Sequence, residues 1–273
     1  MKVLLAAKHP PGGHIKYGGV QSWIETVARR FSILGHETHV WGPEWGKPEG
    51  SYDIGVIANI KYSAAAALLC DRVLNVSHGV IPAEEPSGAY PIACTSEEVR
   101  DHWKLPSQII RQPIELSNWT PFGYKPEHLV LYSYRCPDSS QFQKLADALE
   151  LPFIHLKNCT ETEARSMLRK AALVCASGRA ALEAMACGAP TLIYDWRPYN
   201  GKTLFLQCLD DARLNNYSGR GGIEPRLQTV IQEARQVMAA GSQRKYIKRW
   251  HDADMIVCEI LDACSLNTNR SKA

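Results

Sequence analysis

The sequence has no apolar stretch approaching the roughly 18 residues that a membrane-spanning helix needs. Its apolar opening, Lys2–Ala7, is too short for the core of a signal peptide and is soon followed by prolines. The nine cysteines are scattered singly, without a C-x-x-C pair. We therefore expect no integral membrane segment, reduced thiols and a cytoplasmic location.

Excess charge and the common cofactor signatures are also missing. The formal net charge is only +3, from 31 Lys+Arg against 28 Asp+Glu, so charge alone requires neither nucleic acid nor an anionic membrane as partner. The chain has no G-x-G-x-x-G and no P-loop, because Gly42 and Gly46-Lys47 have the wrong spacing. The nine histidines show no H-E-x-x-H. These absences argue against dinucleotide, P-loop nucleotide and zinc-protease chemistry.

What the first part of the chain does contain is an alternation of short apolar runs and amphipathic helices. Gln21–Leu34 places its apolar residues on one helical stripe, and Gly35 suits the left-handed turn that ends a helix. Thr95 or Ser96 begins another helix. Short strands separated by helices favour a parallel sheet covered on both faces. The predicted strands here are Lys2–Ala7, Glu37–Trp41, Ile54–Ile57, Arg72–Val76, Ile92–Cys94 and Gln108–Arg111.

A proline-rich, irregular stretch, Gln112–Pro126, separates this part from a second alternation. It predicts two domains, 1–118 and 119–273. The predicted strands of the second are Leu129–Tyr134, Phe153–Leu156, Leu173–Ala176 and Thr191–Tyr194, and its helices are Ser140–Leu149, Thr160–Ala171 and Arg179–Ala186. The tail from Pro225 predicts two helical stretches split near Gly241-Ser242, and no strand. The predicted fold class is α/β, with two Rossmann-like parallel-sheet domains whose strand ends face a ligand-binding cleft.

Two glycine-containing segments stand where ligands bind in such sheets. The first joins the first strand to the first helix and ends in Gly18-Gly19, where backbone N–H groups can approach an anion. The second follows the strand Leu173–Ala176 and consists of Ser177-Gly178, a helix of small residues carrying Glu183, and Gly188-Ala189-Pro190. Close backbone approach together with one carboxylate suits a ligand that has phosphates and vicinal hydroxyls. A surface loop and a tightly packed junction are the structural alternatives.

Together these segments resemble the family-4 glycosyltransferases of the GT-B fold. Gly18-Gly19-Val20-Gln21-Ser22, followed by a helix and Gly35-His36-Glu37, resembles the opening of that family. Leu182–Pro190 resembles its nucleotide-binding signature, and Ala93–Val99 and Arg111–Glu115 occur in the order that the family has between the two. The resemblance covers nearly the whole chain. It implies two facing domains and a last helix that crosses back to the first domain.

The resemblance also implies roles for individual residues. Glu183 would accept hydrogen bonds from the donor ribose, and Gly18 and Gly19 would lie against the donor diphosphate. Arg135 would neutralise the diphosphate as it leaves, while His78, in Val76-Ser77-His78-Gly79, would line the sugar pocket. A structural arginine and a packing histidine are the alternatives.

Two positions depart from the family pattern. Cys175 stands eight residues before Glu183, where the family often has a glutamate. The family lysine that follows the arginine is replaced by Ser140 and Gln141, so either Lys144 or the helix N–H groups near Ser139-Ser140 would serve the diphosphate.

The resemblance predicts a hexosyl- or pentosyltransferase that moves a sugar from a UDP- or GDP-linked donor to an acceptor hydroxyl, with retention and without metal or cofactor. Asp252-Ala253-Asp254 is formally the metal motif of another glycosyltransferase fold, but its position in an amphipathic helix indicates a solvated face. The acceptor could be a glycan, a lipid-linked or small molecule, or hydroxymethylated DNA. From Arg213 onward, the sequence has ten Lys/Arg and only six Asp/Glu, and this basic excess weakly favours DNA or anionic lipid as the acceptor. A sugar-nucleotide-binding module without catalysis is the remaining alternative.

Overall fold

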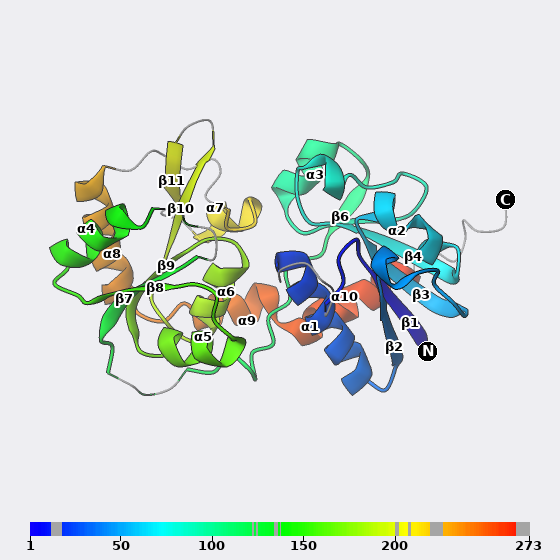
Figure 1. Ribbon diagram of the computed structural model, residues 1–273, viewed down its shortest axis with the longest axis horizontal. Coiled ribbons are helices and arrows are strands. Elements are labelled where there is room, and N and C mark those ends of the chain that lie inside the picture. Colours follow the sequence, from blue (N-terminus) through cyan, green and yellow to red (C-terminus); the bar gives the residue numbers. More distant parts are fainter. Residues whose placement is uncertain are drawn as a thin grey trace. The chain divides into compact units, whose positions relative to one another are not determined.

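The computed structural model describes residues 1–11, 18–121, 123, 125–133, 136, 138–199, 202–206, 209–218 and 226–265, of which 194–199 and 202–206 are described by their backbone alone. The chain divides into two compact units (Figure 1). Unit 1 holds Met1–Glu115 and the segment that begins at His251, and unit 2 holds Leu116–Trp250. Within the described residues, no helix is long and apolar enough to span a bilayer.

Unit 1 is built on a six-stranded, wholly parallel sheet, as the sequence predicts, and its strand order is β2-β1-β3-β4-β5-β6. Its strands are β1 (Lys2–Ala6), β2 (Glu37–Trp41), β3 (Tyr52–Ala58), β4 (Cys70–Ser77), β5 (Ile92–Cys94) and β6 (Ser107–Ile109). Its helices are α1 (Gly19–Ile33), α2 (Ile60–Ala67), α3 (Glu97–Trp103) and α10 (Ala253–Ser265), with short 3₁₀ turns η1 (Pro43–Trp45) and η2 (Pro82–Glu84).

The core of unit 1 forms between the sheet and two helices that are far apart in sequence. Trp23, Val27 and Phe31 form the apolar stripe of α1 and are fully buried. Helix α10 packs beside α1 and adds Ile256 and Ile260 to the same core (Figure 1). The last helix therefore belongs to unit 1, which confirms that the chain crosses back to its first domain.

The turn after α1 forms as its glycine predicts. Gly35 has φ +83°, in the region that side chains with a Cβ rarely adopt, and the N–H of His36 donates to the carbonyl of Phe31 at 3.0 Å. The helix after β5 begins at Ser96, the second of the two expected caps, whose hydroxyl accepts the N–H of Val99 at 3.4 Å.

Unit 2 contains a five-stranded sheet in the order β11-β10-β9-β7-β8. Its strands are β7 (His128–Tyr132), β8 (Phe153–Leu156), β9 (Ala171–Ala176), β10 (Thr191–Tyr199) and β11 (Lys202–Leu206). Its helices are α4 (Ser140–Ala148), α5 (Glu161–Leu168), α6 (Arg179–Ala186), α7 (Leu209–Leu214), α8 (Leu227–Ala240) and α9 (Arg244–His251). Pairing is parallel except at β11, which runs antiparallel to β10 and is absent from the predicted elements.

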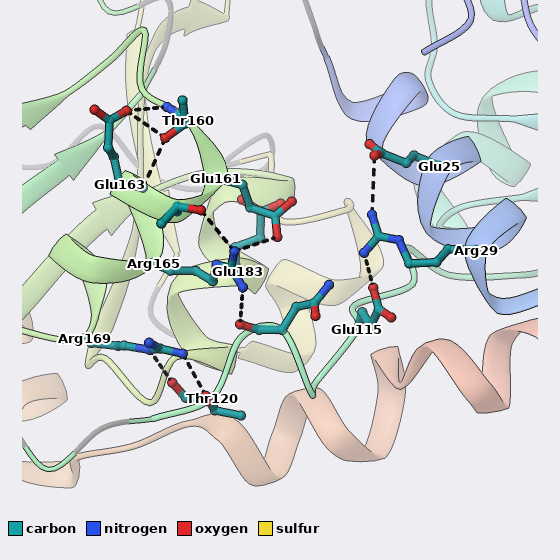
Figure 2. Close-up of polar contacts among 12 residues, drawn as sticks. Glu25, Arg29, Glu115, Thr120, Thr160, Glu161, Glu163, Arg165, Arg169 and Glu183 are labelled. Atoms are coloured by element: carbon teal, nitrogen blue, oxygen red, sulfur yellow. Dashed lines mark hydrogen bonds and ion pairs between the residues drawn. The ribbon is translucent and has the colours of Figure 1, made fainter. Parts of the chain in front are cut away.

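Helix α5 of unit 2 shows how local sequence sets the ends of a helix. Thr160 and Glu163 form a reciprocal capping box at the start of α5 (Figure 2). Arg169, just after that helix, donates to the carbonyl and hydroxyl of Thr120, both at 2.7 Å (Figure 2). These contacts tie α5 to the segment that enters unit 2.

The boundary of unit 1 is closed by contacts between its two separate segments. The N–H of Ile114 donates to the carbonyl of His251 at 2.7 Å, and Glu115 accepts from Arg29, which also contacts Glu25 at 3.3 Å (Figure 2). Arg30 forms an ion pair with Asp254. The tail has three helices rather than the expected two, because α9 and α10 are separated at Asp252.

Candidate functional site

The carboxyl edge of the unit 2 sheet brings together three of the predicted site residues. Strand β9 ends at Ala176, so Ser177 and Gly178 form the turn into α6, which carries Glu183 in its second turn. The neighbouring strand β7 ends at Tyr132, and Tyr132 pairs with Ala176 in the register of the two parallel strands. A carboxylate, a phenol and a helix start thus gather where parallel sheets bind ligands.

Glu183 is the centre of this arrangement. Its side chain is buried, with the residue 8% exposed, and each carboxylate oxygen has one partner. Oε1 accepts from Nε of Arg179 at 2.9 Å, and Oε2 accepts from the hydroxyl of Tyr132 at 3.0 Å. Since a carboxylate has about four acceptor positions, two remain for ligand hydroxyls. The geometry fits a carboxylate fixed in one orientation before a ligand arrives.

Burial dominates the electrostatics of this group. It raises the pKa of Glu183, while the charge of Arg179 and the two hydrogen bonds act in the opposite direction. Burial also raises the pKa of Tyr132 well above its ordinary value, and the adjacent Glu183 charge adds to that shift. Tyr132 therefore stays a hydroxyl donor at neutral pH. Sequence reasoning named neither Tyr132 nor Arg179, although Arg179 lies four residues before Glu183, a spacing that places both on one helix face.

The turn at Gly178 needs glycine. Its φ of +58° and ψ of −138° lie in a region that residues with a Cβ rarely adopt. The N–H of Gly178 donates to the carbonyl of Tyr217 at 2.5 Å, and the Tyr217 side chain is fully buried. The segment after α7 thus fixes the start of α6. Tyr217 is a further residue that the sequence pattern did not identify.

Cys175 has a packing role in the structure. Its side chain is completely buried in the core of unit 2, beside Leu131 and Leu173, and burial raises the pKa of the thiol. The position that the family often fills with a glutamate therefore supplies no anionic ligand here.

The start of α4 differs from the expected arrangement. Ser140 donates its backbone N–H to Asp138 Oδ1 at 2.8 Å and its hydroxyl to Oδ2 at 3.0 Å. These bonds are the main reason that the pKa of Asp138 is lowered, and Lys144 contributes a smaller effect. The carboxylate of Asp138 thus accepts the N–H group of Ser140, which the sequence predicts to be available to a diphosphate. Lys144 is exposed on α4, and Arg135 lies outside the described residues.

In unit 1, His78 follows β4 and is buried, with 9% of the residue exposed. Its ring contacts Trp23 edge-on, with centroids 5.1 Å apart. Neither His78 ring nitrogen nor Nε1 of Trp23 has a hydrogen-bond partner within the described part of the chain. Burial lowers the pKa of His78 to about 3, so the imidazole is neutral at pH 7. Three buried polar atoms without partners indicate a place for a polar ligand or water.

Gly18 and Gly19 begin α1. Gly18 is the extended N-cap, with φ −143°, and neither glycine has a positive φ. A Cβ at Gly19 would meet none of the described residues within 4 Å. These positions permit close approach of a ligand to the helix N-terminus, but their backbone conformation does not itself require glycine.

No group of three or more His, Cys, Asp or Glu side chains that could hold a metal occurs among the described residues. The prediction that Asp252-Ala253-Asp254 lies on a solvated helix face was wrong in part. Asp252 lies at the junction before α10, where Oδ1 accepts the N–H of Asp254 at 3.1 Å, and Asp254 pairs with Arg30. Both aspartates therefore serve the closure of unit 1.

Comparison with known proteins finds similarity to solved structures only. No protein-family model and no curated protein matches the sequence. Among solved structures, the chain is similar to AviGT4, a glycosyltransferase involved in avilamycin A biosynthesis, with a TM-score of 0.67, 15% identity and 97% of both chains covered. It is also similar to sucrose-phosphate synthase from Thermosynechococcus elongatus, with a TM-score of 0.57, 10% identity, and 96% of this chain and 97% of that one covered. The chain therefore has the GT-B fold.

Proposed function

We propose that the protein is a glycosyltransferase that moves a sugar from a nucleotide-diphosphate donor to an acceptor hydroxyl. The observation that carries this proposal is the arrangement of Glu183, buried at the carboxyl edge of the unit 2 sheet and oriented by Arg179 and Tyr132. A fixed carboxylate with unused acceptor positions is suited to the cis-diol of a ribose. Likeness to two glycosyltransferase structures over nearly the whole chain supports the same function.

In the proposed reaction, unit 2 holds the nucleotide. The two hydroxyls of the ribose donate to Glu183, and the first turn of α6 behind Gly178 lies toward the phosphates, where the helix dipole favours negative charge. Arg135 and Lys144 supply positive charge to the diphosphate. UDP or GDP is the expected nucleotide. Ser177 lies in the same turn, and we expect the ligand to approach its backbone closely.

The proposed chemistry needs little from the protein beyond positioning and charge stabilisation. The bond between the anomeric carbon and the diphosphate oxygen breaks, and the diphosphate keeps the electron pair. The acceptor hydroxyl forms the new bond on the same face and passes its proton to the departing diphosphate, which gives retention. His78, neutral at pH 7, orients the sugar, and Gly18 and Gly19 approach the diphosphate. We propose that this proceeds without a metal ion.

The first test is a thermal-shift screen against UDP, GDP, ADP, dTDP and their common sugars. A ligand that binds only the native state raises the melting temperature by mass action. We expect one nucleotide family to stabilise the wild type and Glu127→Ala, which changes an exposed unit 2 carboxylate, but not Glu183→Ala. The absence of any response in the wild type would refute the function. Donor binding without transfer to any acceptor or to water would instead indicate a non-catalytic sugar-nucleotide module.

Two further measurements test the finer parts of the proposal. NMR of the product reports whether the anomeric configuration of the donor is kept, and an inverted product would refute the same-face mechanism. Assays with and without excess EDTA test the metal requirement, and we expect equal rates. A loss of activity that added Mg²⁺ or Mn²⁺ restores would refute metal independence.

A further inference from the structure

A carboxyl group in unit 1, that of Glu84, differs from the buried carboxylates of Glu115 and Glu183. Glu84 ends the short turn η2, on the carboxyl side of the parallel sheet, and the residue is partly buried. Its Oε2 accepts the backbone N–H of His78 at 3.4 Å, and the side chain of Asn59 lowers the pKa of the same carboxyl group. Sequence reasoning did not single out Glu84.

Glu115 and Glu183, the two carboxylates that are buried among the described residues, each have an arginine partner, as does the partly buried Glu97. Glu115 pairs with Arg29 and Arg30, Glu97 with Arg111, and Glu183 with Arg179. Within the same described residues, Glu84 has no ion pair, although its neighbour Glu85 pairs with Lys61 at 3.9 Å. A partly buried carboxylate without a cation is costly to the folded state, and such groups concentrate at binding and catalytic sites.

The turn that carries Glu84 is held without its carboxyl group. The hydroxyl of Ser77 donates to the backbone carbonyl of Glu84 at 2.7 Å, and Nε1 of Trp103 donates to the carbonyl of Gly79 at 2.9 Å. Nδ2 of Asn59 donates to the carbonyl of Ala83 at 3.1 Å. Side-chain donors therefore hold the end of the turn at Ala83 and Glu84 and the segment before it at Gly79, and the carboxylate of Glu84 keeps acceptor positions that none of the described residues uses.

Exposed apolar side chains lie directly before η2 and on helix α2, which contacts η2. Ile81, immediately before η2, is 57% exposed, and Tyr62, in the first turn of α2, is 40% exposed with Nζ of Lys8 at 4.2 Å from its ring centroid. Exposed apolar side chains before η2 and on the neighbouring helix α2, together with a carboxylate that has no ion pair, match a ligand that offers both hydroxyl groups and a C–H face, as sugars do. An anionic ligand would be repelled by Glu84.

We propose that Glu84 is the hydroxyl-binding carboxylate of an acceptor subsite in unit 1, and that the acceptor is a neutral sugar or similar polyol. This proposal rests on the proposed function and adds the chemical class of the acceptor. Hydroxyl groups of the acceptor donate to the free positions of the carboxylate, while its C–H face packs on Ile81 or Tyr62. The carboxylate of Glu84 stays ionised when the acceptor binds, because the ligand hydroxyls supply the hydrogen bonds that water molecules made before.

The test uses Glu84→Gln, with Glu85→Gln as the matched control on the next, exposed and ion-paired residue. Glutamine keeps the size and the backbone hydrogen bond but removes the charge. The probes are the methyl glycosides of glucose, mannose, galactose and xylose, offered as acceptors with the donor found in the nucleotide screen. For the methyl glycoside that the wild type uses, we expect Glu84→Gln to raise the KM roughly tenfold or more. Hydrolysis of the donor and nucleotide thermal shifts should stay unchanged, and Glu85→Gln should match the wild type.

A stability measurement distinguishes this role from a structural one. Burial raises the pKa of Glu84, so the folded state favours the protonated carboxyl, and the stability that this gives at low pH is lost as pH rises through the folded pKa. The titratable groups on neighbouring elements are His78, Lys61, Tyr62, Glu85 and Lys8, which lies over the Tyr62 ring. Urea unfolding of Glu84→Gln should therefore show stability at least equal to wild type at pH 7, whereas a structural carboxylate would leave the variant less stable.

The outcomes separate the two proposals. Normal nucleotide binding with an unchanged acceptor KM in Glu84→Gln would overturn the assignment of Glu84 and leave the proposed function standing. Transfer by the wild type to a phosphorylated or carboxylated sugar, but to none of the methyl glycosides, would overturn the neutral acceptor class. No nucleotide binding by the wild type would refute the proposed function itself.

Discussion

The hydroxyl of Tyr132 lies 3.0 Å from Oε2 of Glu183, so the end of strand β7 directly orients the carboxylate of helix α6. The two residues are 51 positions apart in sequence. The bond is partly buried and its acceptor Glu183 is buried, and there a hydrogen bond to a charged group stabilises more than an exposed one. Together with Arg179 on the other oxygen, it holds the carboxylate in one orientation without a ligand.

Tyr132→Phe tests that relationship. Removal of the hydroxyl leaves Glu183 Oε2 without its donor, so we expect a loss of about 1.5–3 kcal/mol in the free energy of unfolding. Nucleotide affinity should fall as well, since the carboxylate is oriented less tightly. Urea denaturation at pH 7 measures the first effect and nucleotide titration the second. Tyr52→Phe, whose hydroxyl donates to the carbonyl of Glu49 at an exposed site, should cost clearly less, and equal losses would contradict the special role of Tyr132.

The turn before α6 gives a second prediction. Gly178 has φ +58° and ψ −138°, and although a Cβ there would meet nothing within 4 Å, the backbone conformation itself is strained for any other residue. Gly178→Ala should therefore destabilise the protein by about 1–3 kcal/mol. Gly88→Ala is the control, because Gly88 has neither a positive φ nor a neighbour within 4 Å. Thermal unfolding in which both variants behave alike would contradict this explanation.

A third prediction concerns acid stability and His78. The pKa of this buried imidazole is lowered from 6.5 to about 3, so below pH 6.5 the unfolded chain binds a proton that the folded chain does not. Stability is consequently lost as pH falls from 6.5 toward 3, and at pH 5 the loss from this group is about 2 kcal/mol. His78→Gln should lose about that much less than the wild type between pH 7 and pH 5 in urea unfolding.

The control for this experiment is His102→Gln, which replaces an exposed histidine of α3 and should follow the wild-type pH profile. The difference between the two pH profiles is informative even if glutamine itself packs poorly, because only the slope reports the proton. A His78→Gln profile parallel to that of the wild type would show that the ring gains a proton in the folded state at ordinary acidity.

Where one residue type decides local geometry, the sequence predicts the fold closely. Strands Glu37–Trp41, Ile92–Cys94 and Phe153–Leu156 and helix Arg179–Ala186 are predicted to the residue, because a glycine or a proline flanks each of them. The missed elements lack such signals. Helix α2 is rich in alanine and begins without a side-chain cap, at Asn59 in a left-handed conformation.

The candidate site is less predictable because its partners come from separate segments. Glu183 and Gly178 stand in a recognisable motif, but Tyr132 reaches Glu183 only through the pairing of β7 with β9. The missing charge partner of Glu84 likewise has no sequence signal, since it depends on which side chains surround the turn after folding. Such properties are set by packing between elements.

The last prediction concerns Arg244, the first residue of α9, which contacts the end of the site helix α6. Its guanidinium donates to the backbone carbonyls of Leu116, Trp119 and Ala186, the last of which ends α6. Because a planar guanidinium can serve several acceptors at once and an ammonium group has a different geometry, lysine is not an equivalent. We expect Arg244→Ala to lower the free energy of unfolding by about 2–4 kcal/mol, since it leaves buried carbonyls without a donor.

Arg244→Lys should recover only part of that loss, and Lys245→Ala, on the adjacent exposed residue, should stay close to the wild type. Urea denaturation of the four proteins at pH 7 gives the comparison. Full recovery in Arg244→Lys would show that charge alone matters at this position, and that the three carbonyl contacts do not hold the end of α6 against the segment that enters unit 2. Partial recovery would show that the shape of the guanidinium is needed, because only it reaches all three carbonyls from one position.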